Sequence, residues 1–349
     1  MTKIANRYET SAHSSKGGMS EVIVCRDTHL DRDVVLKRLQ GGVGQQRLID
    51  EQKALLKLRS KHVVQLLDIV KTNAFGIDEN CLVLEYIDGA DVSAGSFAAN
   101  EEYVKSLWQI ATGIADIHKA GVIHRDIKPN NIRKDTMGVL KIFDFGLARE
   151  VGKDDKTRNI IGTPGYMAPE LVGATTMAFS PAVDVYAFGA TAVALLTKNL
   201  PPELLHHQQV TRSYLDKLMP GLHPDLLDAI QKCTSLAATD RPRMGDVRDL
   251  LQRLLLKDRH RARIVSDAKV YELNASNRRI SLKSSVGAFS IDYDGFNFVI
   301  ASVSGDVFIN NKPATVGQKM HSACVITIGQ QGLGRAFLTF DVSNPEVLA

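Results

Sequence analysis

The residues best suited to chemistry lie in two short stretches near the middle of the chain. The first is residues 124–131 (HRDIKPNN), and the second, which begins 18 residues after Asp126, is residues 144–146 (DFG). Phosphoryl transfer to a hydroxyl needs a carboxylate at the nucleophile, oxygen ligands for a divalent ion and positive charge beside the phosphates. Because the two stretches supply all of these groups, they predict a phosphoryl-transfer site.

A hairpin between the two stretches would bring their side chains together. Residues 131–143 have the pattern of a short strand, a turn and a second strand. The open end of this hairpin would place Asn131 and Asp144 side by side as metal ligands. Asp126 would then stand outside the metal as the base, and Lys128 would reach the transferred phosphate. The alternative is a polar surface loop with an unrelated turn, but the full string at this spacing rarely arises by chance.

These motifs resemble those of the eukaryotic-like (Hanks-type) serine/threonine protein kinases, in their bacterial or phage-like branch. The resemblance covers residues 8–256 and continues in order through the other signatures of that family. It implies an α+β, bilobal fold with a β-rich N-lobe over residues 1–88 and an α-helical C-lobe over residues 89–256. It also implies ATP and Mg²⁺ (or Mn²⁺) as cofactors, and protein serine or threonine hydroxyls as acceptors.

Lys37 ends an apolar strand and resembles the ATP-binding lysine of the family. In the helix predicted over residues 45–59, Glu51 shares one face with leucines. An unpaired carboxylate on an apolar face is costly, so we expect Glu51 to pair with Lys37 and orient it toward the phosphates. The alternative is a partly exposed glutamate at the edge of the helix.

Residues 15–22 stand where the family has its glycine-rich phosphate loop, which implies nucleotide contacts for Ser15, Gly17 and Val22. Serines replace the first and third glycines, and only the middle one, Gly17, stays. The middle glycine matters most for the approach of the backbone to the phosphates, so we expect ATP binding to survive. Val35 replaces the usual alanine and would press on the adenine pocket.

Residues 82–89 (LVLEYIDG) resemble the hinge between the two lobes. The resemblance implies that Leu84 is the gatekeeper and that the backbone from Glu85 to Ile87 bonds to adenine.

Residues 162–170 (GTPGYMAPE) resemble the substrate-positioning loop of the family. Together, Thr163 and Lys128 imply serine and threonine acceptors rather than tyrosine. The resemblance also implies a structural salt bridge between Glu170 and Arg241.

Asp184 has two compatible interpretations. After Ser180 and Pro181 it fits the start of a helix, with the serine as N-cap and the acid against the positive helix end. The resemblance implies that it holds the backbone of the catalytic loop, so we expect a structural role.

Regulation is expected to depend on Arg125, Thr157 and Thr163. A buried guanidinium beside a catalytic aspartate is commonly neutralised by a phosphate on the activation segment. Thr157 is the one hydroxyl-bearing residue between Gly146 and Gly162. We therefore predict that a second copy of the chain phosphorylates Thr157 in trans.

The composition changes after residue 256. We expect a basic linker over residues 257–265 and a small all-β domain over residues 266–349, with strands at 296–302, 305–310, 323–328 and 336–340. The domain weakly resembles a degenerate forkhead-associated (FHA) sandwich. Ser304 stands where that family has asparagine, and residues 285–288 lack its arginine and histidine. Packing on the kinase or recruitment of a substrate is therefore as plausible as phosphothreonine binding.

The bulk composition is that of a globular protein. The chain has 349 residues, 44% hydrophobic residues and a formal net charge of +4, and its four cysteines form no C-x-x-C pair. No apolar run approaches the roughly 18 residues of a membrane span. The one dense basic cluster, residues 257–263, is most simply a solvated linker, and the alternative is a patch that binds phosphate or acidic groups. We expect a cytoplasmic protein without membrane or specific nucleic-acid partners.

Two other functions fit parts of the sequence. A pseudokinase scaffold would usually have lost Lys37, Asp126 or Asp144, and all three are present. A small-molecule phosphotransferase on the same fold would not need the APE segment, residues 168–170, which shapes a peptide groove.

Overall fold

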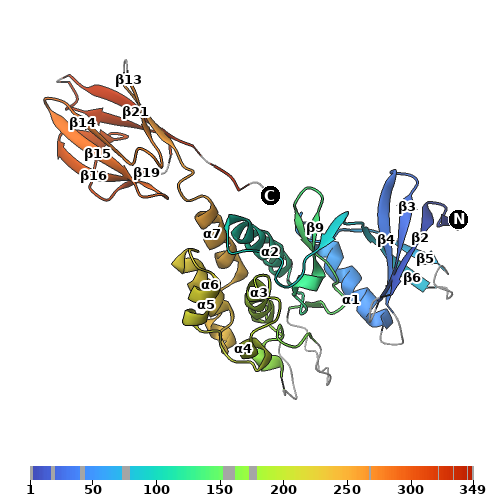
Figure 1. Cartoon of the computed structure of the whole chain (residues 1–349). Coiled ribbons are helices and arrows are strands. Elements are labelled where there is room, and N and C mark those ends of the chain that lie inside the picture. Colours follow the sequence, from blue (N-terminus) through green and yellow to red (C-terminus); the bar gives the residue numbers. More distant parts are fainter. Residues whose placement is uncertain are drawn as a thin grey trace. The chain divides into compact units, whose positions relative to one another are not determined.

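The structure is a computed structural model that describes residues 3–16, 20–39, 44–72, 79–151, 162–172, 179–266, 269–320, 322–332, 334–343 and 345–347. The chain forms two compact units, residues 1–251 and 252–348 (Figure 1). None of the helices in the described ranges is both long enough and apolar enough to cross a membrane.

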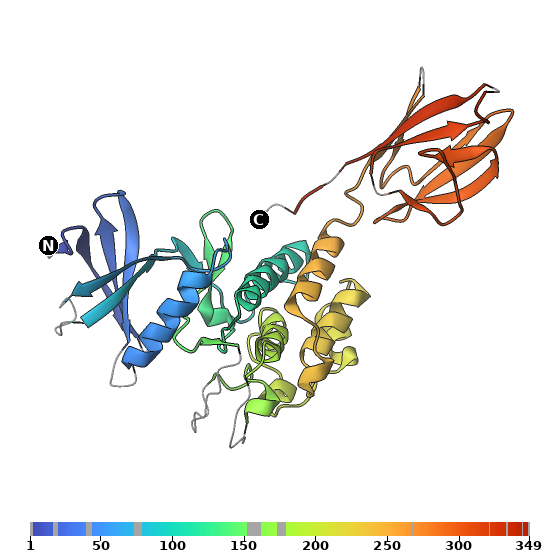
Figure 2. The same ribbon diagram turned by 180° about the vertical axis from the view of Figure 1, so that it is seen from behind.

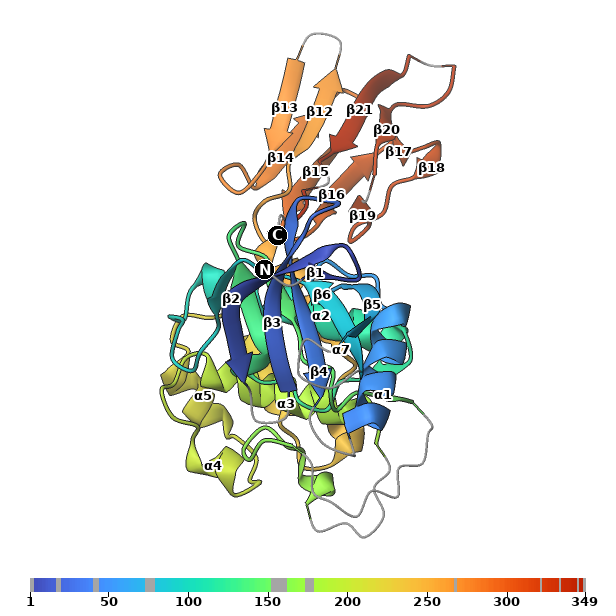
Figure 3. The ribbon, with the colours of Figure 1, turned by 90° about the vertical axis from the view of Figure 1, so that its right-hand side faces the viewer.

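A six-stranded antiparallel sheet opens the first unit, with strand order β1-β2-β3-β4-β6-β5. Its strands are β1 (Lys3–Ile4), β2 (Tyr8–Lys16), β3 (Ser20–Asp27), β4 (Arg32–Leu39), β5 (Leu66–Thr72) and β6 (Glu79–Glu85). Side chains alternate along β4, so Val34 and Leu36 enter a buried core while Val35 and Lys37 face the other side. Helix α1 (Gly44–Lys57) lies beside β4 and β5 (Figure 3).

The rest of the first unit is mainly helical. Its helices are α2 (Glu101–Lys119), α3 (Ala182–Ala194), α4 (Pro202–Leu205), α5 (Arg212–Leu218), α6 (Pro224–Cys233) and α7 (Met244–Leu255), with single 3₁₀ turns η1 (Pro129–Asn131), η2 (Pro169–Leu171) and η3 (Ala238–Asp240). Helices α2 and α3 pack against each other (Figure 2). The N-cap expected at Ser180 is wrong: Pro181 occupies the cap position of α3 and makes no side-chain cap.

Two small sheets connect these parts. Strands β7 (Gly89–Asp91), β9 (Ile132–Asp135) and β10 (Leu140–Ile142) form one, and β8 (Val122–Ile123) pairs with β11 (Arg149–Glu150) in the other. The β9–β10 pair is the hairpin that the sequence predicts. The expected α+β fold, with a β-rich N-terminal region and a helical region after it, is confirmed.

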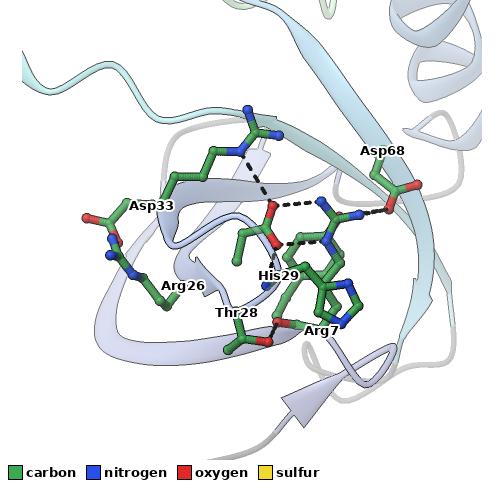
Figure 4. A network of polar contacts seen from close by, with 9 residues as sticks. Arg7, Arg26, Thr28, His29, Asp33 and Asp68 are labelled. Atoms are coloured by element: carbon green, nitrogen blue, oxygen red, sulfur yellow. Dashed lines mark hydrogen bonds and ion pairs between the residues drawn. The ribbon is translucent and has the colours of Figure 1, made fainter.

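A polar network closes the end of the first sheet (Figure 4). Arg7 donates two hydrogen bonds of 2.7 Å to the carboxylate of Asp27, which is fully buried. Arg32 contacts the same carboxylate at 3.4 Å, and the Tyr8 hydroxyl donates to Asp68 at 2.7 Å. The hydrogen bonds from Arg7 hold the pKa of Asp27 well below its ordinary value, against the opposing effect of burial.

This network makes the stability of the sheet sensitive to acid. The unfolded chain protonates Asp27 near its ordinary pKa of 3.8, whereas the folded chain resists protonation. The stabilisation is therefore present above about pH 4 and is lost as the pH falls below it. We expect Asp27→Asn to lower the free energy of unfolding at pH 7, and this deficit to shrink below pH 4. Urea titrations between pH 3 and 7 measure the effect.

The matched control is Asp33→Asn, because Asp33 is an exposed partner of Arg26 in the same region (Figure 4). Its urea titrations should follow the wild type at every pH. A constant deficit for Asp27→Asn across the whole pH range would contradict the prediction.

The second unit is a sandwich of two antiparallel sheets. A six-stranded sheet has the order β13-β12-β21-β20-β17-β18, and a four-stranded sheet has the order β14-β15-β16-β19 (Figure 3). The strands are β12 (Ala262–Ser266), β13 (Lys269–Leu273), β14 (Arg279–Lys283), β15 (Gly287–Tyr293), β16 (Phe298–Gly305), β17 (Val307–Ile309), β18 (Lys312–Pro313), β19 (Lys319–Met320), β20 (Cys324–Ile328) and β21 (Ala336–Val342). One buried core, including Phe289, Ile291, Ile326 and Phe340, is shared by both sheets.

The linker predicted over residues 257–265 needs correction. Strand β12 starts at Ala262 and pairs with both β13 and β21, so the C-terminal part of the predicted linker belongs to a sheet. Ala262 and Ile264 are buried while Arg263 is exposed, and this alternation was hidden inside a run of basic residues. The four predicted strands correspond to β16, β17, β20 and β21. The FHA-like identity of the unit stays a prediction.

Candidate functional site

A cavity of about 240 Å³ opens between the first sheet and the β9–β10 hairpin. It is lined by Val22, Val35, Lys37, Val64, Leu84, Glu85, Tyr86, Ile87, Arg133, Phe143 and Asp144. Val35 and Leu84 are direct partners across the β4–β6 pair, which places both on one wall. The cavity is mostly apolar, and the charged residues in its lining are Lys37, Glu85, Arg133 and Asp144. It is therefore suited to a flat apolar ring attached to an anionic group.

Lys37 is the centre of the charged end of the cavity. Its Nζ lies 2.7 Å from Glu51 Oε1 and 2.8 Å from Asp144 Oδ1. Burial alone would lower the pKa of Lys37, but the two carboxylates raise it above its ordinary value. Lys37 is therefore held protonated and in a fixed position. Glu51 is fully buried behind it on α1 and does not line the cavity.

Asp144 keeps its negative charge for the same reason. Burial would raise the pKa of Asp144, but the charge and hydrogen bond of Lys37 lower it. The backbone at Asp144 has φ = 66°, in the left-handed region that non-glycine residues rarely adopt. Such strain persists only where the surrounding structure enforces it, and it often marks functional positions.

Asp126 is the centre of a second polar cluster. Its Oδ1 accepts from the Thr163 hydroxyl at 2.9 Å, and its Oδ2 lies 2.8 Å from Lys128 Nζ. Lys128 also donates to the Thr163 hydroxyl at 2.7 Å. Asn131 Nδ2 donates to both the backbone oxygen and Oδ2 of Asp126, at 2.8 and 2.9 Å. The carboxylate of Asp126 is thus fixed in orientation, as a general base must be.

Residues 124–131 form the loop that is expected to be catalytic and is called the catalytic loop from here on. Its backbone is held by Asp184, which is fully buried. Its carboxylate accepts from the backbone N–H groups of His124 and Arg125, each at 2.8 Å, and lies 2.9 Å from His118 Nε2. Burial would raise the pKa of Asp184, but the contact with His118 lowers it. The structure thus brings Asp184 to the loop backbone, where the resemblance places it.

Asn131 and Asp144 are the side chains expected to hold a divalent ion. The backbone N–H of Phe143 donates to the backbone oxygen of Asn131 at 3.0 Å. Because Asp144 follows Phe143, the two candidate ligands lie next to each other at the open end of the hairpin. Asn131 uses its Nδ2 toward Asp126, which leaves Oδ1 as the oxygen to offer a cation.

In the described ranges, no group of three or more histidine, cysteine, aspartate or glutamate side chains is arranged to hold a metal. One carboxylate and one amide oxygen nevertheless fit Mg²⁺, which takes much of its coordination from phosphates and water.

Several predicted residues lie elsewhere or outside the described residues. Arg125 is buried, with its guanidinium 4.2 Å from the centre of the Phe179 ring and a left-handed φ of 71°. Gly17 and Thr157 lie outside the described residues, as does the side chain of Ser15; the backbone of Ser15 pairs with Val22.

The expected contact between Glu170 and Arg241 is present. It consists of two hydrogen bonds of 2.7 and 2.8 Å between the guanidinium and the carboxylate.

Sequence reasoning missed Val64, Arg133 and Phe143 in the cavity wall. Phe143 precedes Asp144, and Arg133 lies two residues after Asn131, so alternation along the hairpin was an available signal. The position of Val64 at the cavity is fixed by a hydrogen bond of 3.0 Å from its N–H to Ile142 O. No pattern in the sequence around Val64 indicates this tertiary contact.

Comparisons with known proteins show similarity to one family over most of the chain. The family model described as the protein kinase domain matches residues 8–268. Serine/threonine-protein kinase PkaB from Streptomyces coelicolor is 32% identical over 72% of this chain and 64% of its own length. Rhodopsin kinase GRK1 from Homo sapiens is 30% identical over 67% of the chain and 44% of its own.

Probable serine/threonine-protein kinase pknA2 from Bifidobacterium longum is 31% identical over 69% of the chain and 34% of its own length. The chain therefore spans less than two thirds of each of these three relatives.

Proposed function

Because this chain belongs to the protein kinase domain family, we propose that it transfers the γ-phosphoryl group of ATP to serine or threonine hydroxyls of proteins. The observation that carries the proposal is the position of Lys37, bonded to Glu51 and Asp144 at the charged end of an apolar cavity. The intact set of Lys37, Asp126 and Asp144 favours an active enzyme over a pseudokinase scaffold.

In this proposal each side chain has one task. Lys37, oriented by Glu51, binds the α- and β-phosphates. Asp126 orients the acceptor hydroxyl and accepts its proton, while Lys128 offsets negative charge on the phosphoryl group in transfer. Asn131 and Asp144 would hold Mg²⁺, or Mn²⁺ in its place, which when bound neutralises charge on the phosphates. The apolar wall of Val22, Val35, Leu84 and Ile87 would hold adenine, bonded to the backbone from Glu85 to Ile87.

Serine and threonine acceptors are supported by the cluster of Thr163, Lys128 and Asp126. The same proposal includes phosphorylation of Thr157 in trans. The guanidinium of Arg125 would then form an ion pair with the phosphate on Thr157.

The test is a transfer assay with γ-³²P-ATP and the full chain, with a generic basic protein as acceptor. We expect label in the acceptor and in the enzyme itself. Asp144→Ala should reduce transfer at least about 100-fold, because it removes the carboxylate of the metal site. Asp249→Ala, an exposed carboxylate on α7 paired with Arg248, is the matched control and should transfer at the wild-type rate.

The three candidate functions give different results in this assay. Absence of transfer by the wild type would favour the pseudokinase scaffold. Label confined to an added small-molecule alcohol would favour the small-molecule phosphotransferase.

A further inference from the structure

Two neighbouring carboxylates on α1 bond to two different sheets. Glu51 holds Lys37 of β4 in the large sheet. The preceding residue, Asp50, holds Arg149 of β11, with 3.0 Å between Asp50 Oδ2 and Arg149 Nη1. Only Glu51 takes part in the site described above, so the contact of Asp50 has no role in it so far.

Arg149 is firmly anchored where it meets Asp50. It pairs with Ile123 in the β8–β11 ladder, and its Nη1 also donates to the backbone oxygen of Ala148 at 2.9 Å. Strand β8 runs directly into His124, whose N–H group is bonded to the buried Asp184. Asp50 therefore ties α1 to the strand pair from which the catalytic loop emerges.

The pair is placed where a charge contact is effective. The side chains of Asp50 and Arg149 are 20% and 15% exposed, so water and salt screen their attraction less than that of a surface pair. Apart from β11, helix α1 mainly contacts β4 and β5 of the six-stranded sheet. The Asp50–Arg149 pair is thus a link between α1 and the β8–β11 pair that flanks the catalytic loop.

We infer that Asp50 is a positioning residue for phosphoryl transfer, which acts through Glu51 and Lys37. By holding α1 to β11, it keeps Glu51 against Lys37 while the catalytic loop is in place. Because Asp50 and Arg149 supply both charges of the ion pair, the link between α1 and β11 needs no phosphorylated residue. The inference rests on the proposed function for its effect on rate, whereas its effect on α1 can be measured independently.

The experiment uses the full chain and three variants: Asp50→Asn, Arg149→Gln and the charge-swapped double variant D50R/R149D. Hydrogen–deuterium exchange of residues 44–57 reports on α1, and steady-state kinetics report kcat and the KM for ATP. We expect each single variant to exchange about 5- to 10-fold faster in α1 and to lose about 5- to 10-fold in kcat. The charge-swapped pair should regain at least half of both losses, because the link depends on two opposite charges and not on which residue carries each. The KM for ATP should stay near the wild-type value, whereas general damage to the fold would change it as well.

The matched control is the charge-swapped double variant E102K/K134E. It alters an exposed ion pair with 2.9 Å between Lys134 Nζ and Glu102 Oε1. It should leave both readouts unchanged. The inference would be overturned if hydrogen–deuterium exchange in α1 were the same in Asp50→Asn as in the wild type. It would also be overturned if the charge-swapped variant D50R/R149D regained neither loss. If α1 responds as expected but the wild type transfers no phosphate, the positioning of α1 by Asp50 stands and the proposed function fails.

Discussion

Asp126→Asn is expected to lower kcat by about 10²- to 10⁴-fold, the range that a positioned general base contributes. An amide cannot accept the proton of the acceptor hydroxyl, although it keeps the shape of the carboxylate and part of its contacts with Thr163 and Asn131. Asp126 does not line the cavity, so the KM for ATP should change little. Initial rates at saturating protein acceptor, over a range of ATP concentrations, measure both constants.

The control for this prediction is Asp216→Asn on α5. Asp216 is half exposed and pairs with Arg212, far in sequence from the catalytic loop, so its loss should leave kcat unchanged. If Asp126→Asn retained more than a tenth of the wild-type kcat, another group would have to accept the proton and the assignment of Asp126 would be wrong.

Arg241→Met is expected to lower the free energy of unfolding of the first unit by about 3–5 kcal/mol. The guanidinium is fully buried and makes two hydrogen bonds to Glu170. It also donates to the backbone oxygens of Ser235, Ala182 and Leu236 at 2.8 to 3.1 Å. Methionine fills a similar volume but leaves the carboxylate and three carbonyls without this donor. Urea unfolding, followed by the fluorescence of Trp108, measures the change.

Arg243→Met is the matched control, because Arg243 is exposed two residues later in the chain. Its effect should stay within about 0.5 kcal/mol. A loss of similar size in both variants would show that the Arg241 network contributes nothing specific. Arg241→Lys should fall between the two, since an ammonium group cannot form the paired contact with Glu170.

Much of the first unit was predictable because its chemistry lies in short, local patterns. The hairpin that carries Asn131 and Asp144 follows from strand and turn composition, and the face of Glu51 follows from helical spacing. The contact of Glu51 with Lys37 could be predicted because a buried carboxylate needs a partner and only a few cations are placed to supply one.

Other features depend on contacts between segments far apart in the chain. The place of Val64 in the cavity results from its bond to Ile142, and the link from Asp50 to Arg149 joins residues 99 positions apart in the sequence (149 minus 50). No local pattern encodes either contact.

In the second unit, β13 and β14 are short strands rich in charged residues, as in KVYEL and RISLK. Their outward side chains obscure the alternation, and pairing within the sheet stabilises strands that composition alone does not indicate.

The left-handed backbone at Arg125 and Asp144 sets stability against activity. Each residue would relax if it were glycine, which adopts this conformation without steric penalty. Selection for a more stable protein would therefore favour glycine at two positions where the proposed function uses a guanidinium for regulation and a carboxylate for the metal site. Stabilised variants obtained by screening for heat resistance alone should accumulate losses of function at these two positions.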